Sequence, residues 1–109
     1  MGRGSLGELE HQVMLTLLRR GGESYSVDVV AELEARTGRE HLVSAIFVVL
    51  GRLTEKRLLS SRMVDPTPGE GGHARRYFAV TDAGIQALRE SRRNYLSLWE
   101  GVEPILDEG

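Results

Sequence analysis

The order of segments between Arg52 and Thr81 constrains this chain more than any other feature. Residues 58–64 and 74–80 alternate between apolar and polar side chains, which is the pattern of half-buried β-strands. The stretch between them, 65–72, holds two prolines and three glycines and suits neither a helix nor a central strand. The sequence therefore predicts a β-hairpin with a long tip, preceded by a helix that ends in basic residues.

Two helices are predicted before this region. Ser5 and Glu8 have the spacing of a capping box, and Gly21-Gly22 stops the helix that they begin. Its apolar stripe is Leu6, Leu9, Val13, Leu17 and Leu18. Ser26 is suited to cap the second helix, which Gly38 ends. The buried stripe expected for that helix is Val27, Val30 and Leu33.

A third helix is predicted to begin between Leu42 and Ser44 and to end near Lys56 and Arg57, whose charges suit a helix C-terminus. Apolar residues recur in it at steps of three and four, so we expect them to be buried. They are Val43, Ile46, Phe47, Leu50 and Leu53. The opposite, outward face is then expected to carry Ser44, Val48 and Val49.

Thr81, followed by Asp82, is predicted to cap a fourth helix. Its apolar positions are Ile85, Leu88, Tyr95, Trp99, Val102 and Leu106. The predicted fold class is α+β: a winged helix-turn-helix domain over 5–80, with three helices and a two-stranded β-wing, and a long C-terminal helix over 81–107.

The charge of the chain is unevenly distributed. The net charge is −2, yet Arg52 to Arg76 holds six basic and three acidic residues, a local excess of three positive charges. Such a face attracts phosphates even when the whole chain is acidic. The alternative is that these are ordinary solvated charges.

Composition excludes several classes of protein. The chain has no cysteine, so thiolate catalysis, thiolate metal sites and disulfides are excluded. The three histidines are scattered, and no Ser/His/Asp arrangement or phosphate-binding glycine loop is present, so we expect neither an enzyme nor a metal or cofactor site. No apolar run reaches membrane-spanning length and no signal peptide opens the chain, so a cytoplasmic location is expected.

Several short motifs occur in a fixed order along the chain. They are Leu6-Gly7-Glu8-Leu9-Glu10, Tyr25-Ser26-Val27, Ala45-Ile46-Phe47, Arg52-Leu53, Leu58-Leu59-Ser60-Ser61, Ala74-Arg75-Arg76-Tyr77-Phe78 and Ala83-Gly84. In this order they resemble the PadR family of bacterial transcriptional regulators, specifically its short subfamily with a single C-terminal dimerisation helix. The resemblance implies a homodimeric repressor of a palindromic operator, with the third helix in the major groove and the wing at the flanking minor groove.

The third helix departs from the pattern of that family. The family has a tyrosine followed by polar or proline positions, whereas this chain has Phe47-Val48-Val49. Phenylalanine and valine keep the shape of the helix and lose hydroxyl donors. We therefore expect a modest sequence preference, or one carried partly by DNA shape.

The residues expected to contact double-stranded DNA lie on the second helix, the third helix and the wing. Arginine and lysine bind phosphates, a helix N-terminus offers amides to an anion, and an outward valine contacts a thymine methyl. The candidates are Tyr25, Ser26, Ser44, Val48, Arg52, Lys56, Arg62, His73, Arg75 and Arg76. The alternatives are ion pairs within the chain, such as Arg52 with Glu55, and packing of Val48 and Val49 against a neighbouring helix.

The last helix carries the only tryptophan of the chain on an apolar stripe that has no evident place in the core. A two-fold partner supplies a place for such a stripe. The expected dimer interface is Leu6, Leu9, Leu88, Tyr95, Trp99 and Val102. Trp99 is also a candidate platform for a small aromatic effector, because the resemblance implies an aromatic residue that faces its symmetry mate.

A different class of function fits part of the sequence. A winged-helix domain that docks another protein through Val48 and Val49 is favoured by the acidic total charge and by the donor-poor third helix. The basic wing disfavours it. Salt-sensitive binding to duplex DNA discriminates the two.

Overall fold

The computed structural model describes residues 6–41, 43–66, 68–69, 71–72 and 74–107. Ser5, one half of the expected capping box, and His73, one of the expected DNA contacts, lie outside these residues. The described elements follow in the order α1 (Glu8–Arg19), β1 (Glu23–Tyr25), α2 (Ser26–Thr37), α3 (Val43–Glu55), β2 (Leu59–Val64), β3 (Arg75–Val80), α4 (Asp82–Trp99) and α5 (Glu103–Asp107).

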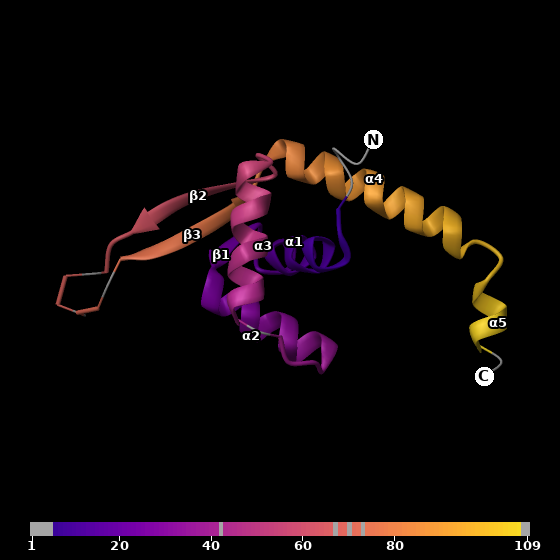
Figure 1. The fold of residues 1–109 in the computed structure, drawn as a ribbon, viewed down its shortest axis with the longest axis horizontal. Coiled ribbons are helices and arrows are strands. Elements are labelled where there is room, and N and C mark those ends of the chain that lie inside the picture. The colour runs from indigo at the N-terminus through magenta and orange to yellow at the C-terminus, as the bar shows by residue number, and fades with distance from the viewer. Residues whose placement is uncertain (1–5, 42, 67, 70, 73, 108–109) are drawn as a thin grey trace.

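Helices α1, α2 and α3 pack together with the base of the sheet, while the β2–β3 hairpin extends to one side and α4 to the other (Figure 1). The core draws residues from every one of these parts except β1, and its most enclosed side chains include Met14 and Leu17 of α1, Ile46, Leu50 and Leu53 of α3, and Leu59 of β2. The architecture is an α+β winged helix with a long C-terminal helix, as the sequence predicts.

The sheet has three strands, in the order β1-β3-β2, and all neighbours are antiparallel. Strand β1 pairs with β3, with Tyr25 opposite Tyr77, and it makes the predicted two-stranded wing one strand wider at its base. In β2, Ser61 lies opposite Phe78 and Arg62 opposite Tyr77. This register decides which face of the hairpin each arginine occupies.

Three helix termini are close to those expected, and one cap is different. Glycines with positive φ follow both α1 and α2. They are Gly21 and Gly22 after α1, and Gly38, in the left-handed conformation, at the end of α2. The Thr81 hydroxyl accepts from the Gly84 amide at 3.0 Å and caps α4. The expected Ser26 cap is wrong, because α2 begins at Ser26 itself and Tyr25 occupies the N-cap position.

At the start of α1 the capping interaction lies two residues later than expected. The carboxylate of Glu10 accepts a hydrogen bond from the Gly7 amide at 2.8 Å. Glu10 is only 5% exposed, so its interaction is part of the packed structure and not a surface feature.

The buried stripes of α1 and α2 differ from the prediction by single residues. In α1, Met14 is buried and Leu18 is exposed, and in α2, Val29 is buried while Val27 is exposed. Met14 and Leu18 are four positions apart, and Val27 and Val29 are two apart. In each helix, packing against the neighbouring elements decides which of the two apolar residues is buried.

The C-terminal helix ends earlier than expected. Helix α4 stops at Trp99, and Gly101 has φ +82, a conformation that breaks the helical path. A short helix, α5, then turns away from the axis of α4 (Figure 1). The apolar stripe predicted to run from Ile85 to Leu106 along one helix is therefore divided between two. No described helix is both long and apolar enough to cross a membrane.

Candidate nucleic-acid interface

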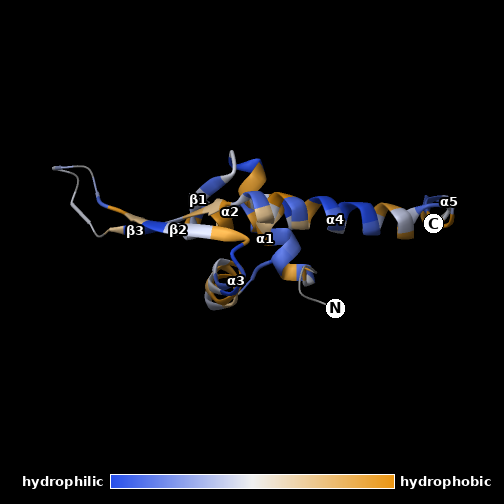
Figure 2. Cartoon of the chain, turned by 90° about the horizontal axis from the view of Figure 1, so that it is seen from above, coloured by the Kyte–Doolittle hydropathy of each residue, from blue (hydrophilic) through white to orange (hydrophobic). Residues whose placement is uncertain are grey.

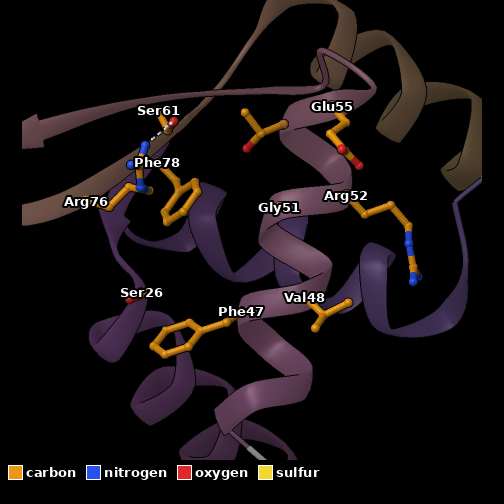
Figure 3. Close-up of a pocket in the computed structure, with 10 residues that line it drawn as sticks. Ser26, Phe47, Val48, Gly51, Arg52, Glu55, Ser61, Arg76 and Phe78 are labelled. Atoms are coloured by element: carbon orange, nitrogen blue, oxygen red, sulfur yellow. Dashed lines mark hydrogen bonds between the residues drawn. The ribbon is translucent and has the colours of Figure 1, made fainter.

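A groove of about 750 Å³ lies between α3 and the hairpin (Figure 3). Its lining combines apolar, hydroxyl and charged side chains from α2, α3, β2 and β3. They are Ser26, Phe47, Val48, Gly51, Arg52, Thr54, Glu55, Ser61, Arg76 and Phe78. Six of these positions, from Phe47 to Glu55, are on α3, so one side of the groove is this helix.

The exposed face of α3 differs from the predicted one at two neighbouring positions. Val49, expected outward, is 5% exposed and belongs to the core, whereas Phe47, expected in the core, is 49% exposed. Val48 is exposed as predicted, at 57%. Figure 3 shows Phe47 on the side of α3 nearer Ser26, with Val48 and Arg52 on the other side. Two large apolar side chains therefore lie outward on this helix.

Two arginines line this groove from different elements. Arg52 comes from the last turns of α3 and Arg76 from β3, and both are exposed. One guanidinium nitrogen of Arg76 donates to the Ser61 hydroxyl at 3.1 Å across the hairpin (Figure 3). The hydroxyl holds that guanidinium while leaving its other donors available to a phosphate or a base.

The other two arginines of the hairpin occupy the opposite face of the sheet. Successive side chains of a strand alternate between faces, so Arg75 and Tyr77 share one face while Arg76 and Phe78 share the other. The Arg62 guanidinium lies 4.8 Å from the Tyr77 ring centroid, and that of Arg75 lies 5.1 Å from the Tyr25 ring centroid. The two rings meet edge to face at 4.7 Å.

This cation–π cluster of Arg62, Arg75, Tyr25 and Tyr77 connects the hairpin to the start of α2. Partial desolvation and the nearby charge of Glu23 raise the pKa of the Tyr77 hydroxyl. The cluster fixes both arginine stems by stacking. Two of the predicted DNA contacts, Arg62 and Arg75, thus have a second role in positioning the wing.

Lys56 forms an ion pair within the chain. Its ammonium lies 2.9 Å from one Glu10 carboxylate oxygen and 3.1 Å from the other. Burial alone raises the pKa of Glu10, but the hydrogen bonds from the Gly7 amide and from Lys56, together with the charges of Lys56 and Arg52, outweigh it and lower that pKa. The charge of Lys56 thus neutralises a buried carboxylate, and its contact with DNA stays a prediction.

The remaining predicted contacts are placed as follows. Ser26 lines the groove at the first turn of α2, and Tyr25 belongs to the cation–π cluster. Ser44 is exposed at the first turn of α3. Within the described residues, no three His, Asp or Glu side chains come together as metal ligands.

A second groove, of about 450 Å³, separates α1 from α4. Its lining is mainly apolar and aromatic, with two arginines. The residues are His11, Leu15, Leu18, Ile85, Leu88, Arg89, Arg92, Tyr95, Leu96 and Trp99. The rings of His11 and Tyr95 are 5.3 Å apart, and His11 Nδ1 lies 2.9 Å from the Ser91 hydroxyl. Burial lowers the pKa of His11.

The residues expected at a dimer interface fall into two groups. Leu88 is only 6% exposed and belongs to the core, and Leu6 and Leu9 pack against that core. These three stabilise the fold of the single chain, in which α4 packs on α1. Tyr95, Trp99 and Val102 remain exposed, as do Leu96 and Leu98, which the sequence interpretation missed.

Several solved structures are similar to this chain. A PadR-like transcription factor from Bacteroides fragilis is 27% identical, with a TM-score of 0.74 over 89% of this chain and 88% of that one. A PadR family transcriptional regulator from Eggerthella lenta is also 27% identical, with a TM-score of 0.68 over 94% of this chain and 88% of that one. The PadR of Bacillus subtilis, solved with operator DNA, is 21% identical and has a TM-score of 0.62 over 76% of this chain and 45% of that one, which supports the fold alone.

No curated protein matches the chain in sequence. The family model of PadR-like transcriptional regulators matches residues 14–90. This range begins in the second turn of α1, contains α2, α3 and the hairpin, and ends halfway along α4. The chain belongs to the PadR-like family of transcriptional regulators, and is a transcription regulator rather than an enzyme.

Proposed function

We propose that this PadR-like regulator is a cytoplasmic homodimeric repressor that binds a palindromic operator through α3 and the hairpin. The observation that carries the proposal is that Arg52 and Arg76 line one groove with the exposed face of α3. A helix that projects from a domain between cationic side chains suits a major groove, whose walls are phosphates.

The hairpin supplies further positive charge. Arg62 and Arg75 lie on the face opposite to the α3 groove, held over Tyr77 and Tyr25, and both residues are exposed. Guanidinium groups fixed in this way lose little conformational entropy when they bind a phosphate. The PadR of Bacillus subtilis was solved with operator DNA, and part of it shares the fold of this chain, so we propose the same use here.

The dimer is proposed from the second half of α4. Tyr95 and Trp99 are 44% exposed and Leu96 is 61% exposed, although each is large and apolar. This half of the helix extends beyond α1 (Figure 1), and apolar residues are interspersed along it (Figure 2). Covering these side chains with a second copy removes their surface from water, at roughly 25 cal/mol per Å². A single C-terminal dimerisation helix is the arrangement of the short subfamily.

A small aromatic effector is proposed at the groove between α1 and α4. Trp99 and Tyr95 line it, beside His11 and two arginines, so a flat and weakly anionic ring finds stacking surfaces and positive charge. Trp99 is the only tryptophan, so its fluorescence reports binding without interference. Quenching of that fluorescence by planar aromatic compounds, with a saturable dependence on concentration, is the expected result.

One observation favours a second candidate, docking of another protein on α3. Phe47 and Val48 present apolar surface to solvent, as a protein-binding patch does. A selection from a random duplex pool separates the candidates. The DNA-binding proposal expects an inverted repeat bound by two chains, with half-sites about one helical turn apart or a multiple of it. Failure to enrich any duplex contradicts it and leaves protein docking as the function of this face.

A further inference from the structure

The outward face of α3 has an apolar stripe at its middle. A helix that reads bases through hydrogen bonds needs polar side chains at such positions. Ser44, Val48, Gly51 and Glu55 follow one another at steps of four, three and four residues, so they lie on one face of the helix. Between the two polar ends of this stripe are Val48 and Gly51, with Phe47 beside them. Val48 is 57% exposed and Phe47 is 49% exposed, so the middle of the stripe offers no side-chain donor.

The chemistry of the major groove limits what such a surface recognises. Base edges present hydrogen-bond donors and acceptors there, and the apolar group among them is the C5 methyl of thymine. An apolar side chain placed against a donor or acceptor leaves that group without a partner, which costs binding free energy. Against a thymine methyl, the same side chain gains from removing apolar surface from water. Exposed apolar side chains such as Val48 and Phe47 are therefore suited to thymine.

Charges around the stripe agree with DNA as the occupant rather than an apolar protein surface. Arg52 and Arg76 line the same groove as Phe47 and Val48, from different elements. Figure 3 shows Arg52 and Arg76 on opposite sides of α3. Positive groups on both sides of an apolar strip match a groove with phosphate walls and methyl groups on its floor.

Gly51 removes the steric barrier to this contact. It lies three residues after Val48 on the same face, and a Cβ added there meets no described atom within 4 Å apart from its chain neighbours and the adjacent backbone of α3. A glycine at this position lowers helix stability, because glycine has a low helix propensity. It lets a base edge or sugar approach the helix backbone more closely than any side chain allows.

We propose that this protein selects its operator through thymine methyl groups, which Val48 and Phe47 contact in the major groove. The inference rests on the proposed DNA-binding function and adds the class of base that is read. Phe47 and Val48 point to different sides of α3 (Figure 3), so each is expected to reach a different base pair. Each half-site is expected to hold one or two thymines at which the methyl group is required.

The test replaces thymine by deoxyuridine, which removes the C5 methyl and leaves the hydrogen-bonding groups of the base unchanged. Duplexes recovered by selection are resynthesised with deoxyuridine at one thymine at a time. Affinity is measured by fluorescence anisotropy at fixed salt. Removal of one contacted methyl is expected to weaken binding about fourfold, the equivalent of one buried methylene.

Two valine variants identify the side chain responsible. Val48→Ala is expected to reduce the ratio of thymine to deoxyuridine affinity towards one at one position of each half-site. Val27→Ala is the matched control, because Val27 is also 57% exposed but lies on α2. It is expected to keep the wild-type ratio. Circular dichroism melting of both variants checks that the fold is retained.

The outcomes separate this inference from the function on which it rests. A thymine preference that disappears in Val48→Ala supports the inference. Salt-dependent duplex binding with equal affinity for thymine and deoxyuridine at every position overturns methyl recognition and leaves DNA binding intact. An absence of duplex binding at low salt overturns the proposed function itself, and the inference with it.

Discussion

The ammonium of Lys56 lies 2.9 Å from the carboxylate of Glu10, which joins the end of α3 to the beginning of α1. The Glu10 side chain is 7% exposed and that of Lys56 is 34% exposed, so the pair is largely shielded. The same carboxylate accepts from the Gly7 amide. One acidic residue thus connects the N-terminus of α1 to the C-terminal end of α3.

Lys56→Met is expected to destabilise the fold by about 1–3 kcal/mol, because it leaves the buried Glu10 carboxylate without its main partner. Urea unfolding measures the change. The exposed pair of Arg36 with Glu32, at 3.3 Å, provides the control, and Arg36→Met is expected to cost less than about 1 kcal/mol. Equal losses of unfolding free energy in the two variants would show that the Lys56–Glu10 pair stabilises the fold no more than an exposed ion pair does.

The same pair predicts how stability depends on acid. The pKa of Glu10 is lowered in the folded chain, so the unfolded chain takes up a proton first as the pH falls. The stabilisation is fully present above the ordinary pKa of 4.5 and is lost as the pH falls through the lower folded-state value. Glu10→Gln is expected to be less stable than wild type at pH 7, with a smaller decline below pH 4.5, in urea titrations at several pH values.

His11 predicts a second pH dependence, at higher pH. Burial lowers its pKa below the ordinary value of 6.5, so the folded state favours the neutral ring. Its contribution is complete above pH 6.5 and decreases as the pH falls towards the folded-state pKa, because the unfolded chain binds the proton more readily. Thermal midpoints between pH 5 and 7 are expected to fall less in His11→Gln than in wild type. An identical slope in both proteins would exclude His11 as the source.

Much of this fold follows from sequence, and the exceptions have physical reasons. Glycines and prolines define the hairpin tip and the ends of α1 and α2 without tertiary information, and Thr81 caps α4 as predicted. The run Ile46 to Leu50 is apolar at every position, so periodicity cannot say whether Phe47 or Val49 faces the core. Packing against α1 and α2 decides it.

The remaining misses concern short or solvent-facing features. Strand β1 has three residues, too few for a periodic pattern, and it forms because β3 offers it an edge. The Lys56–Glu10 pair joins positions 46 residues apart, a distance over which the sequence carries no pairing signal. Gly101 and Pro104 are local signals for the end of α4 after Trp99. The apolar stripe continues past them to Leu106, so the sequence pattern favours one longer helix.

Gly51 and Gly84 predict opposite effects of one substitution. Gly51→Ala is expected to stabilise the fold by about 0.5–1 kcal/mol, because a helical glycine is replaced in open space. It is also expected to weaken DNA binding, since a methyl group then projects from the outward face of α3. Gly84→Ala is expected to destabilise by about 1–3 kcal/mol, because its Cβ meets the Leu58 carbonyl and the Val80 and Met14 side chains. Thermal melts and duplex anisotropy of both variants make the comparison.

Trp99→Ala is expected to weaken dimerisation and, through it, operator binding. Loss of a buried indole costs a few kcal/mol, which raises the dimer dissociation constant by about a hundredfold or more. Sedimentation velocity at micromolar concentration measures the shift, and Val27→Ala serves as an exposed apolar control away from α4. A monomeric wild type, or a Trp99→Ala variant that dimerises as before, would remove α4 from the interface.

The hairpin arginines predict two kinds of defect. Arg76→Ala removes a charge from the α3 groove and is expected to weaken binding to all duplexes, lowering the slope of log affinity against log salt by about one. Arg75→Ala together with Arg76→Ala is expected to lower it by about two. Tyr25→Leu keeps every charge but removes the ring beneath Arg75, so it is expected to reduce affinity with little change in slope.

The most direct test of DNA binding through α3 and the hairpin is the salt dependence of wild-type affinity for duplex DNA, beside that of Arg52→Ala with Arg76→Ala. Anisotropy of a labelled duplex between about 50 and 200 mM KCl gives the slope, which counterion release sets at about −0.9 per phosphate contact. The account predicts a steep slope for wild type, shallower by about two in the double variant. Binding that is absent at low salt, insensitive to salt, or unchanged in slope in the variant would contradict it.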